Sequence, residues 1–189
     1  MGSEMCIRDR TSVIQKKLIE NFGLKVSDFF QQHDIFTFEV ASDSIVEVMK
    51  FLRDDATLRF NFLTDLCGIH YPDYEKERQF AVVYHMHNWM DNVRIRIKCY
   101  LDGDKPEIDS VTGLFLSSNW QERETYDFYG IIFKGHPQLK RILNMDEMTS
   151  FPLRKEFPME DSGRTDKDDR FFGRTCLLYT SDAADEGLG

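Results

Sequence analysis

The sequence predicts an α+β fold, in which helices pack with a mostly antiparallel sheet and an extended C-terminal arm follows. Residues 80–87 and 93–101 are rich in β-branched and aromatic residues, and the short segment between them is typical of a β-hairpin loop. The segment after Ser42 instead repeats its apolar residues at helical spacing. Near the end of the chain, Pro152 and Pro158 push the residues before them towards extended backbone. Helices segregated from antiparallel strands give the α+β class.

The first predicted helix covers residues 11–21. Thr11 or Ser12 can cap its start, and Gly23 lies just beyond its end, where glycine adopts the left-handed C-cap conformation easily. Residues 34–40, DIFTFEV, consist largely of β-branched and aromatic residues and predict a strand.

A second helix is predicted between Ser42, which can cap it, and the acidic pair at 54–55. Its inward-facing positions follow the i, i+3, i+4, i+7 rule and are Ile45, Val48, Met49 and Leu52. Residues 60–70 predict a strand that ends in a turn near residues 71–73.

The strand at 93–101 alternates apolar and basic residues, which predicts one buried face and one solvated face. Residues 102–106 form a turn by composition, and residues 108–115 predict an edge strand.

Residues 119–129 predict the last long helix. Ser117, Ser118 or Asn119 can cap it, and Gly130 stands where it would stop. Within this helix Trp120, Glu124 and Asp127 share one face, and Arg123 and Asp127 are spaced to form an ion pair.

Beyond this helix, residues 131–133 predict a strand or a buried connector, and Pro137 is placed to start a short helix that runs through Leu143. The remainder predicts irregular backbone with local positive charge, carried by Lys134, Lys140, Arg141, Arg154 and Lys155.

The composition is that of a globular protein. Of 189 residues, 41% are hydrophobic and 30% are charged, and the net charge of -9 argues against binding to nucleic acids. No apolar run approaches the roughly eighteen residues that span a bilayer, so any membrane association is expected through a partner.

Candidates for metal binding are weak. The four cysteines include no CxxC pair, and His85 and His87 share one face of a strand without a third ligand at suitable spacing. There is also no glycine-rich phosphate loop and no dinucleotide fingerprint.

Acid–base catalysis is one alternative for the last helix, with Glu122, Glu124 and Asp127 acting together with His136. It would require carboxylates in unlike environments, one of them with a pKa raised by burial. Nothing in the sequence marks a nucleophile or an oxyanion hole, so the alternative of a charged helix that pairs with the basic segment or with another protein is favoured.

Five short blocks in about forty residues resemble one protein family. They are Glu122-Arg123-Glu124, Tyr126-Asp127-Phe128-Tyr129-Gly130-Ile131, Gly135-His136-Pro137, Lys140-Arg141-Ile142-Leu143 and Pro152-Leu153-Arg154-Lys155. In order and spacing they resemble the C subunit, also called the 30 kDa subunit, of the respiratory NADH:quinone oxidoreductase, complex I. The resemblance covers most of residues 11–174; Phe151 departs from it, because the family more often has a small or polar residue before this proline.

The resemblance implies a non-catalytic scaffold subunit in the quinone module of the peripheral arm of a proton-pumping complex. Its expected partners are the D subunit and the neighbouring iron–sulfur subunits, and it would support electron transfer from NADH to quinone. No cofactor is expected on this chain, because FMN, the iron–sulfur clusters and quinone would bind elsewhere in the complex. The expected location is the cytoplasmic face of the bacterial inner membrane, reached only through the complex.

The same resemblance divides the chain into four parts. Residues 11–117 are expected to form the α+β body and residues 118–174 the signature helix with a partner-wrapping arm, while residues 1–10 and 175–189 do not match the family and are expected to be non-native. The expected partner-interface residues are Glu122, Arg123, Glu124, Asp127, Gly130, His136, Pro137, Lys140, Arg141, Leu143, Pro152, Leu153, Arg154 and Lys155.

Three other functions remain open at this point. One is the equivalent subunit of a related membrane-bound hydrogenase or another quinone-reducing dehydrogenase complex. Another is a free-standing acid–base enzyme that uses Glu124, Asp127 and His136, which would require these three side chains to meet in one pocket. The third is a general interaction module outside respiration.

Overall fold

A computed structural model describes residues 2–157, with side chains from residue 10 onwards. The expected tail at 175–189 and the part of the arm expected at 158–174 lie outside the described residues. Helix α1 (Gly2–Phe22) is followed by α2 (Ile45–Asp54) and α3 (Ser118–Tyr129), and short 3-10 turns cover Gly23–Lys25, Ser42–Ser44 and Lys76–Arg78.

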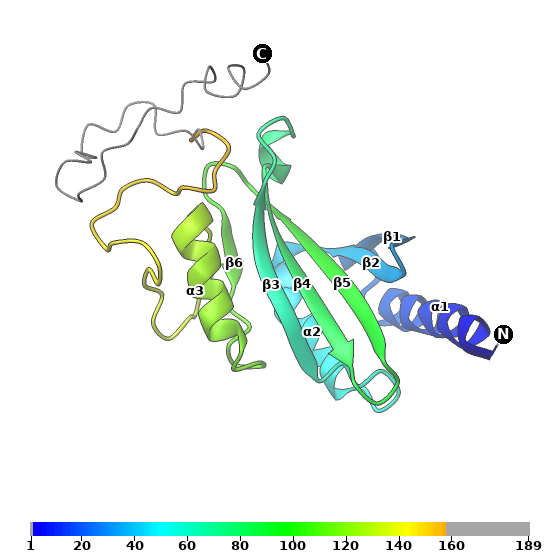
Figure 1. Ribbon diagram of the computed structural model, residues 1–189. Coiled ribbons are helices and arrows are strands. Elements are labelled where there is room, and N and C mark those ends of the chain that lie inside the picture. The colour runs from blue at the N-terminus through cyan, green and yellow to red at the C-terminus, as the bar shows by residue number, and fades with distance from the viewer. Residues whose placement is uncertain (1, 158–189) are drawn as a thin grey trace, which may run out of the picture. The chain divides into compact units, whose positions relative to one another are not determined.

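Five strands form the main sheet in the order β1-β2-β5-β4-β3 (Figure 1). They are β1 (Val26–Gln32), β2 (Ile35–Val40), β3 (Phe62–His70), β4 (Phe80–Asn88) and β5 (Val93–Leu101). All neighbouring pairs are antiparallel except β2 and β5, which are parallel. The predicted mostly antiparallel α+β fold is therefore confirmed, and the hairpin predicted from residues 80–101 is β4–β5.

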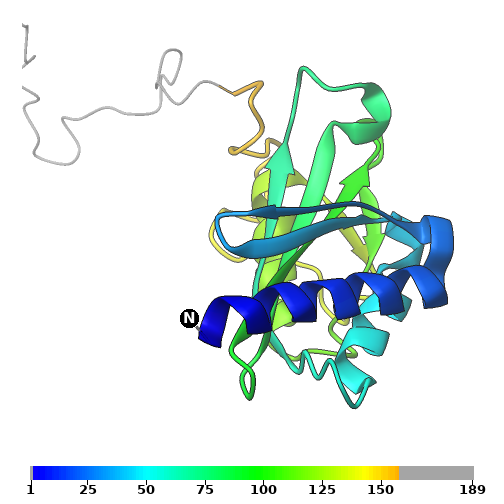
Figure 2. The same cartoon turned by 90° about the vertical axis from the view of Figure 1, so that its right-hand side faces the viewer.

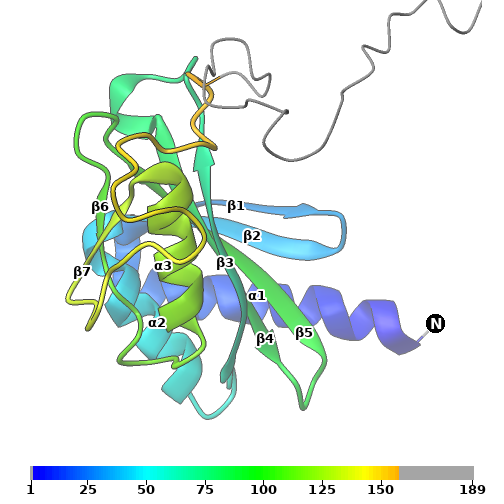
Figure 3. The same ribbon diagram turned by 60° about the vertical axis from the view of Figure 1, so that its left-hand side comes forward.

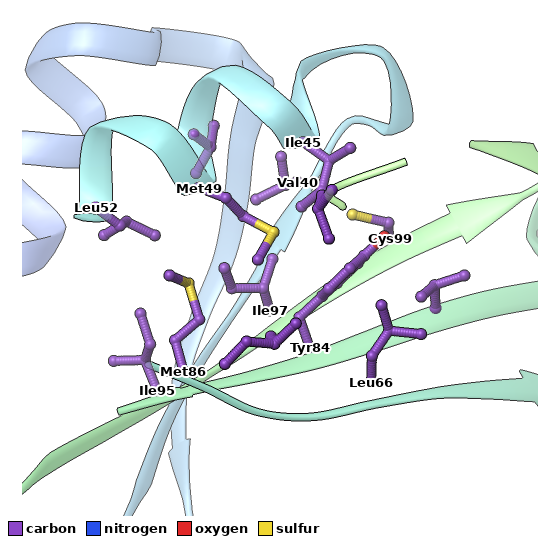
Figure 4. Packing of buried hydrophobic residues seen from close by; sticks show 14 of the residues in the cluster. Val40, Ile45, Met49, Leu52, Leu66, Tyr84, Met86, Ile95, Ile97 and Cys99 are labelled. Carbon is purple, nitrogen blue, oxygen red and sulfur yellow. The ribbon is translucent and has the colours of Figure 1, made fainter. Parts of the chain in front are cut away.

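The apolar stripe of α2 lies on one face of this sheet, as its helical spacing predicts. Ile45, Val48, Met49 and Leu52 are all buried, and in Figure 4 the labelled α2 side chains face Tyr84 and Ile97 on the sheet. Burial of each such side chain stabilises the fold by roughly 1.5–3 kcal/mol. Helix α1 runs beside the β1–β2 hairpin (Figure 2).

Helix α3 packs beside β3, and the remaining chain returns along this helix (Figure 3). Close packing is possible because Gly68 on β3 has no side chain; a Cβ built there would lie 2.7 Å from a ring carbon of Tyr129. A second, two-stranded parallel sheet joins β6 (Glu107–Asp109) to β7 (Ile132–Lys134) and thereby anchors both ends of α3.

The structure corrects two predictions at the start of the chain. Helix α1 begins at Gly2, so Thr11 and Ser12 lie inside it; residues 3–10 contain no proline or glycine that would stop a helix there. Strand β1 was not predicted, because five of its seven residues are exposed at the sheet edge and show no clean alternation. Its turn places His33 and Asp34 at positive φ, as in a tight hairpin.

Three predictions near α3 are also wrong. The edge strand predicted at 108–115 is only β6, since the backbone N–H of Val111 donates to the carboxylate of Glu122 instead of to a strand. No side chain caps the start of α3, and the hydroxyl of Ser118 donates to the carbonyl of Phe115. The helix predicted from Pro137 does not form, because the backbone N–H groups at 142–144 bind a side chain.

Candidate functional site

Asp127 on α3 holds residues 135–157, called the arm from here on. Its Oδ2 accepts hydrogen bonds from the backbone N–H groups of Ile142 at 3.0 Å, Leu143 at 2.8 Å and Asn144 at 2.9 Å. Its Oδ1 accepts from Arg141 Nη1 at 2.8 Å and from the side-chain amide of Asn144 at 3.1 Å. The predicted Arg123–Asp127 pair is thus replaced by an Arg141–Asp127 pair.

The Asp127–Arg141 pair is almost fully withdrawn from solvent, with side-chain exposures of 0% and 6%. Burial alone would raise the pKa of Asp127, but the N–H groups and the guanidinium hold this pKa well below its usual range. Asp127 is therefore charged at neutral pH. A buried charge is tolerated here because every side of the carboxylate has a donor.

Arg141 also organises the arm beyond this pair. Its Nη2 donates to the carbonyls of Met148 at 2.6 Å and Ser150 at 3.1 Å, and its guanidinium lies 4.9 Å from the ring centroid of Phe151. One side chain thus connects Met148, Ser150 and Phe151 to α3.

Arg154 binds the C-terminal part of the arm to the end of α3 and to the sheet. Its Nε donates to the carbonyl of Tyr129 at 2.7 Å, and its guanidinium lies 4.6 Å and 5.0 Å from the rings of Phe151 and Phe80. Burial lowers the pKa of Arg154. Beside it, the N–H of Lys155 donates to His70 Nδ1 at 3.0 Å, which ties the arm to the end of β3.

Gly130 makes this close packing possible. It caps α3 in the left-handed conformation with φ 74°, as predicted, and its N–H donates to the carbonyl of Tyr126. A Cβ at this position would lie 2.6 Å from both Arg154 Nη2 and a ring carbon of Phe151. Glycine at this position therefore serves two purposes: it allows the left-handed cap of α3, and it leaves room for the arm to pack against the end of the helix.

Glu122 and Arg123 contact different parts of the chain. The Glu122 carboxylate is buried and accepts from the Ser110 hydroxyl at 2.6 Å and the Val111 N–H at 2.8 Å. Burial raises the pKa of Glu122, although these two donors oppose the shift. Arg123 instead donates to the carbonyls of Lys140 and Arg141, both at 3.1 Å.

The expected interface residues therefore separate into two groups. Asp127, Arg141 and Arg154 contact other parts of the same chain, and Pro152 is half-buried at the end of the arm. Others face solvent: Glu124, Pro137, Lys140, Leu143, Leu153 and Lys155.

An exposed apolar strip follows the same helix and arm, and sequence inspection assigned only part of it. Leu143 is 67% exposed and Met145 is 74% exposed, although Leu143 lies within the segment that Asp127 holds in place and Met145 directly follows it. Trp120 is also exposed, with the guanidinium of Arg123 at 5.1 Å from its ring. Met145 could have been found from the sequence only by knowing which side of the arm faces the body.

The geometry required by an acid–base enzyme is not formed. In the described part of the chain, no hydrogen bond or ion pair joins any two of Glu124, Asp127 and His136. His136 uses both ring nitrogens locally: Nε2 contacts the carbonyl of Asn119 at 3.2 Å, and Nδ1 accepts from the Gln138 N–H at 3.0 Å. Burial raises the pKa of Glu122 and the donors around Asp127 lower that of Asp127, but the Glu122 carboxylate binds Ser110 and Val111 and has no described hydrogen bond to Glu124, Asp127 or His136.

One ring nitrogen of each histidine considered for metal binding makes a described contact. His85 Nε2 accepts from Arg96 Nε at 2.9 Å, and His87 Nε2 lies 3.2 Å from the Asn92 amide oxygen. Residues 10–157 contain no group of three histidine, cysteine or acidic side chains that could hold a metal ion. None of the described helices is both long and apolar enough to cross a membrane.

Comparisons with known proteins agree on one family. The sequence model of the family described as "Respiratory-chain NADH dehydrogenase, 30 Kd subunit" matches residues 38–163. The chain is 43% identical over 149 residues to the C 2 subunit of NADH-quinone oxidoreductase from Rhizobium etli, covering 78% of each chain. It is 44% identical to the C subunit of NADH-quinone oxidoreductase from a Roseiflexus species over 135 residues, which are 70% of this chain and 76% of that relative.

Solved structures share the architecture. A trypsin-resistant fragment of Nqo5 superposes with a TM-score of 0.55 at 28% identity, over 70% of this chain and 98% of the fragment. A chain of an archaeal membrane-bound sulfane sulfur reductase superposes with a TM-score of 0.65 over 79% of this chain and 86% of its own length; at 23% identity it shows the fold alone. The chain belongs to the family of the 30 kDa subunit of respiratory-chain NADH dehydrogenase, whose relatives are named as the C subunit of NADH-quinone oxidoreductase.

Proposed function

We propose that this chain is a non-catalytic scaffold subunit in the quinone-reducing module of the peripheral arm of a respiratory NADH:quinone oxidoreductase. It docks on the D subunit and neighbouring iron–sulfur subunits, and supports electron transfer from NADH to quinone. FMN, the iron–sulfur clusters and quinone are bound by other subunits, and the complex carries the chain to the cytoplasmic face of the bacterial inner membrane. Family membership supports this assignment at the level of the complex.

One observation supports docking through the arm. The arm is held by a buried ion pair and by successive backbone N–H groups, yet Leu143 and Met145 beside those N–H groups face solvent. A surface that is apolar and already ordered loses little conformational entropy when it binds. The inward Asp127–Arg141 pair therefore shapes the surface, and the outward residues make the contact.

The test is a double substitution, Leu143→Glu with Met145→Glu, in an affinity-tagged chain that replaces the native copy in its own bacterium. The variant is expected to lose most of the co-purifying D subunit and iron–sulfur subunits. Thermal unfolding of the isolated variant is expected to match the wild type, because exposed positions rarely change stability by more than about 0.5 kcal/mol.

The control is Leu24→Glu, which introduces one negative charge, against two in the double variant, at a fully exposed leucine outside the arm. It is expected to assemble normally. Full assembly of the Leu143/Met145 variant would contradict docking through the arm. The wild-type purification also separates the related alternatives, because recovery of hydrogenase or sulfur-reductase subunits would assign the chain to a sister complex.

A further inference from the structure

A second exposed aromatic surface lies at the turn between β4 and β5. Its residues belong to β3, β5 and this turn, whereas the first surface consists of residues of α3 and the arm. Phe62, His87 and Arg94 are direct partners across β3, β4 and β5, so their side chains lie on the same face of the sheet. Trp89, in the turn, lies edge-on to Phe62 at 5.5 Å and 4.8 Å from the His87 ring. We call Phe62, Trp89, Met90 and Arg94 the hairpin patch.

The turn that carries the patch is firmly held. Asn88 is buried; its amide donates to the Leu58 carbonyl at 2.7 Å, and its Oδ1 accepts from the N–H groups of Met90 at 3.0 Å and Asp91 at 3.2 Å. Despite this fixed backbone, Trp89 is 63% exposed and Met90 is 77% exposed. Large apolar side chains displayed on an ordered turn are suited to binding, because little entropy remains to be lost.

Two arginines in or beside the patch, Arg94 and Arg96, form no ion pair with a described carboxylate. Asp91, the carboxylate of the turn, is engaged by Arg10 at 3.2 Å and by the Asn88 amide at 3.0 Å. Arg94 is exposed and forms no ion pair with any described residue. Arg96, further along β5, donates to the uncharged His85 instead of to a carboxylate.

The other charged groups described on this face carry both signs. Asp65 lies 3.8 Å from His85 Nδ1, and burial together with Arg96 lowers the pKa of His85, so this histidine is neutral at pH 7. Glu39 is paired with Arg78 at 2.9 Å. Lys98 lies 5.6 Å from the Phe30 ring.

We infer that the hairpin patch is a second docking surface, and that its partner is a protein segment with an apolar side chain next to a carboxylate. Tryptophan and arginine are the residues most enriched among interface hot spots. Trp89, Phe62 and Met90 receive the apolar side chain, and Arg94 pairs with the carboxylate. The inference rests on the proposed function in one respect: the partner is another subunit of the same assembly.

The test is hydroxyl-radical footprinting with mass spectrometry, applied to the assembly purified through the tagged wild-type chain and to the isolated chain. Tryptophan and methionine oxidise readily, and each surface carries one of each. Trp89 and Met90 report on the hairpin patch, while Trp120 and Met145 report on the α3 and arm surface. Severalfold slower oxidation of Trp89 and Met90 in the assembly is expected.

The two pairs of oxidised residues test docking through the hairpin patch separately from docking through the arm. Protection of Trp120 and Met145 without protection of Trp89 and Met90 would overturn the hairpin patch and leave the proposed function standing. Protection of neither pair would overturn both. Photocrosslinking from position 89 must in addition recover a segment of another subunit with an acidic residue next to an apolar one; a crosslinked segment without a carboxylate contradicts the inferred chemistry.

The role of charge is tested by Arg94→Glu against Arg94→Lys. The glutamate is expected to weaken retention in the assembly about tenfold or more, and the lysine much less, because it keeps the charge. Lys50→Glu, an equal charge change at an exposed position of α2, is the control and should assemble normally.

Other occupants are tested with the isolated chain. The Trp120→Phe variant leaves Trp89 as the sole tryptophan, so its emission reports on this patch alone. A blue shift on adding anionic phospholipid vesicles would assign the patch to a membrane and overturn the inference. A dimer in sedimentation that Trp89→Ala abolishes would assign it to a second copy and also overturn it.

Discussion

Asp127 accepts hydrogen bonds from Arg141, from the Asn144 amide and from three successive backbone N–H groups of the arm. The chain forms an anion site from its own backbone and fills that site with its own carboxylate. Glu122, five residues earlier on the same helix, is equally buried, and its described donors are the neutral groups of Ser110, Val111 and Ser118. The two carboxylates therefore have pKa values shifted in opposite directions.

Asp127→Asn should destabilise the fold, because it removes the charge opposite buried Arg141 and turns one acceptor into a donor. Loss of one partner of a buried ion pair costs about 3–5 kcal/mol. Urea unfolding of the isolated chain measures the change. Glu124→Gln is the control, since it neutralises an exposed carboxylate on the same helix; an equal effect of the two substitutions would contradict the role of Asp127.

Glu122→Gln should change how stability depends on pH. The folded pKa of Glu122 is raised above its ordinary value of 4.5. Its contribution to stability is therefore fully present below that value and is lost as pH rises through the raised pKa. The variant cannot ionise, so its free energy of unfolding relative to wild type should increase as pH rises above 4.5, the ordinary pKa of glutamate.

Asp127 does not interfere with this measurement. Its pKa is lowered, so its contribution is constant above its ordinary value of 3.8 and is lost only as pH falls below it. If the difference in free energy of unfolding between Glu122→Gln and wild type stays constant or falls as pH rises, burial does not disfavour the charged form of Glu122.

At the scale of elements, α3 ends in a glycine that contacts the arm. Gly130→Ala should destabilise the protein by about 1–3 kcal/mol from backbone strain, plus the cost of displacing Arg154 and Phe151. Gly135 also has positive φ but no neighbour within 4 Å of a built Cβ, so Gly135→Ala isolates the strain. Thermal unfolding compares them, and an equal loss in both variants would contradict a tight contact between Gly130 and the arm.

The elements that could be predicted are those with a local signal. Helix α2 and the β4–β5 hairpin follow from hydrophobic periodicity, which reports burial of one face within a few residues. Strand β1 has no such signal, because its residues lie exposed at the sheet edge. The conformation of the arm could not be predicted, because it depends on contacts between residues far apart in the sequence. Asp127 lies 14 residues from Arg141, and His70 lies 85 residues from Lys155.

The candidate site shows the same division. The sequence analysis named its charged residues, including Asp127, Arg141 and Arg154. It did not predict whether their side chains point into the protein or towards solvent. A charged helix followed by a basic segment is compatible with either internal pairing or an outward interface, and only the fold distinguishes them. The neighbours Ile142 and Leu143 show this difference, because Ile142 is half-buried and Leu143 faces solvent.

At the scale of the whole molecule, the described chain carries two exposed apolar surfaces on ordered backbone. One lies on α3 and the arm, around Leu143 and Met145, and the other lies at the β4–β5 turn, around Trp89 and Met90. Asp127 fixes the backbone of the first, and Asn88 fixes the backbone of the second. A subunit with two such surfaces is suited to connecting neighbours within a larger complex.

Whether the arm is already folded before any partner binds is tested most directly by amide hydrogen exchange in the isolated wild-type chain. The N–H groups of residues 142, 143 and 144 are expected to exchange slowly near neutral pH, because each donates to Asp127. Their protection should disappear together in Asp127→Asn. Exchange of these three amides at the rate of an unstructured peptide in the wild-type chain would contradict a preformed arm.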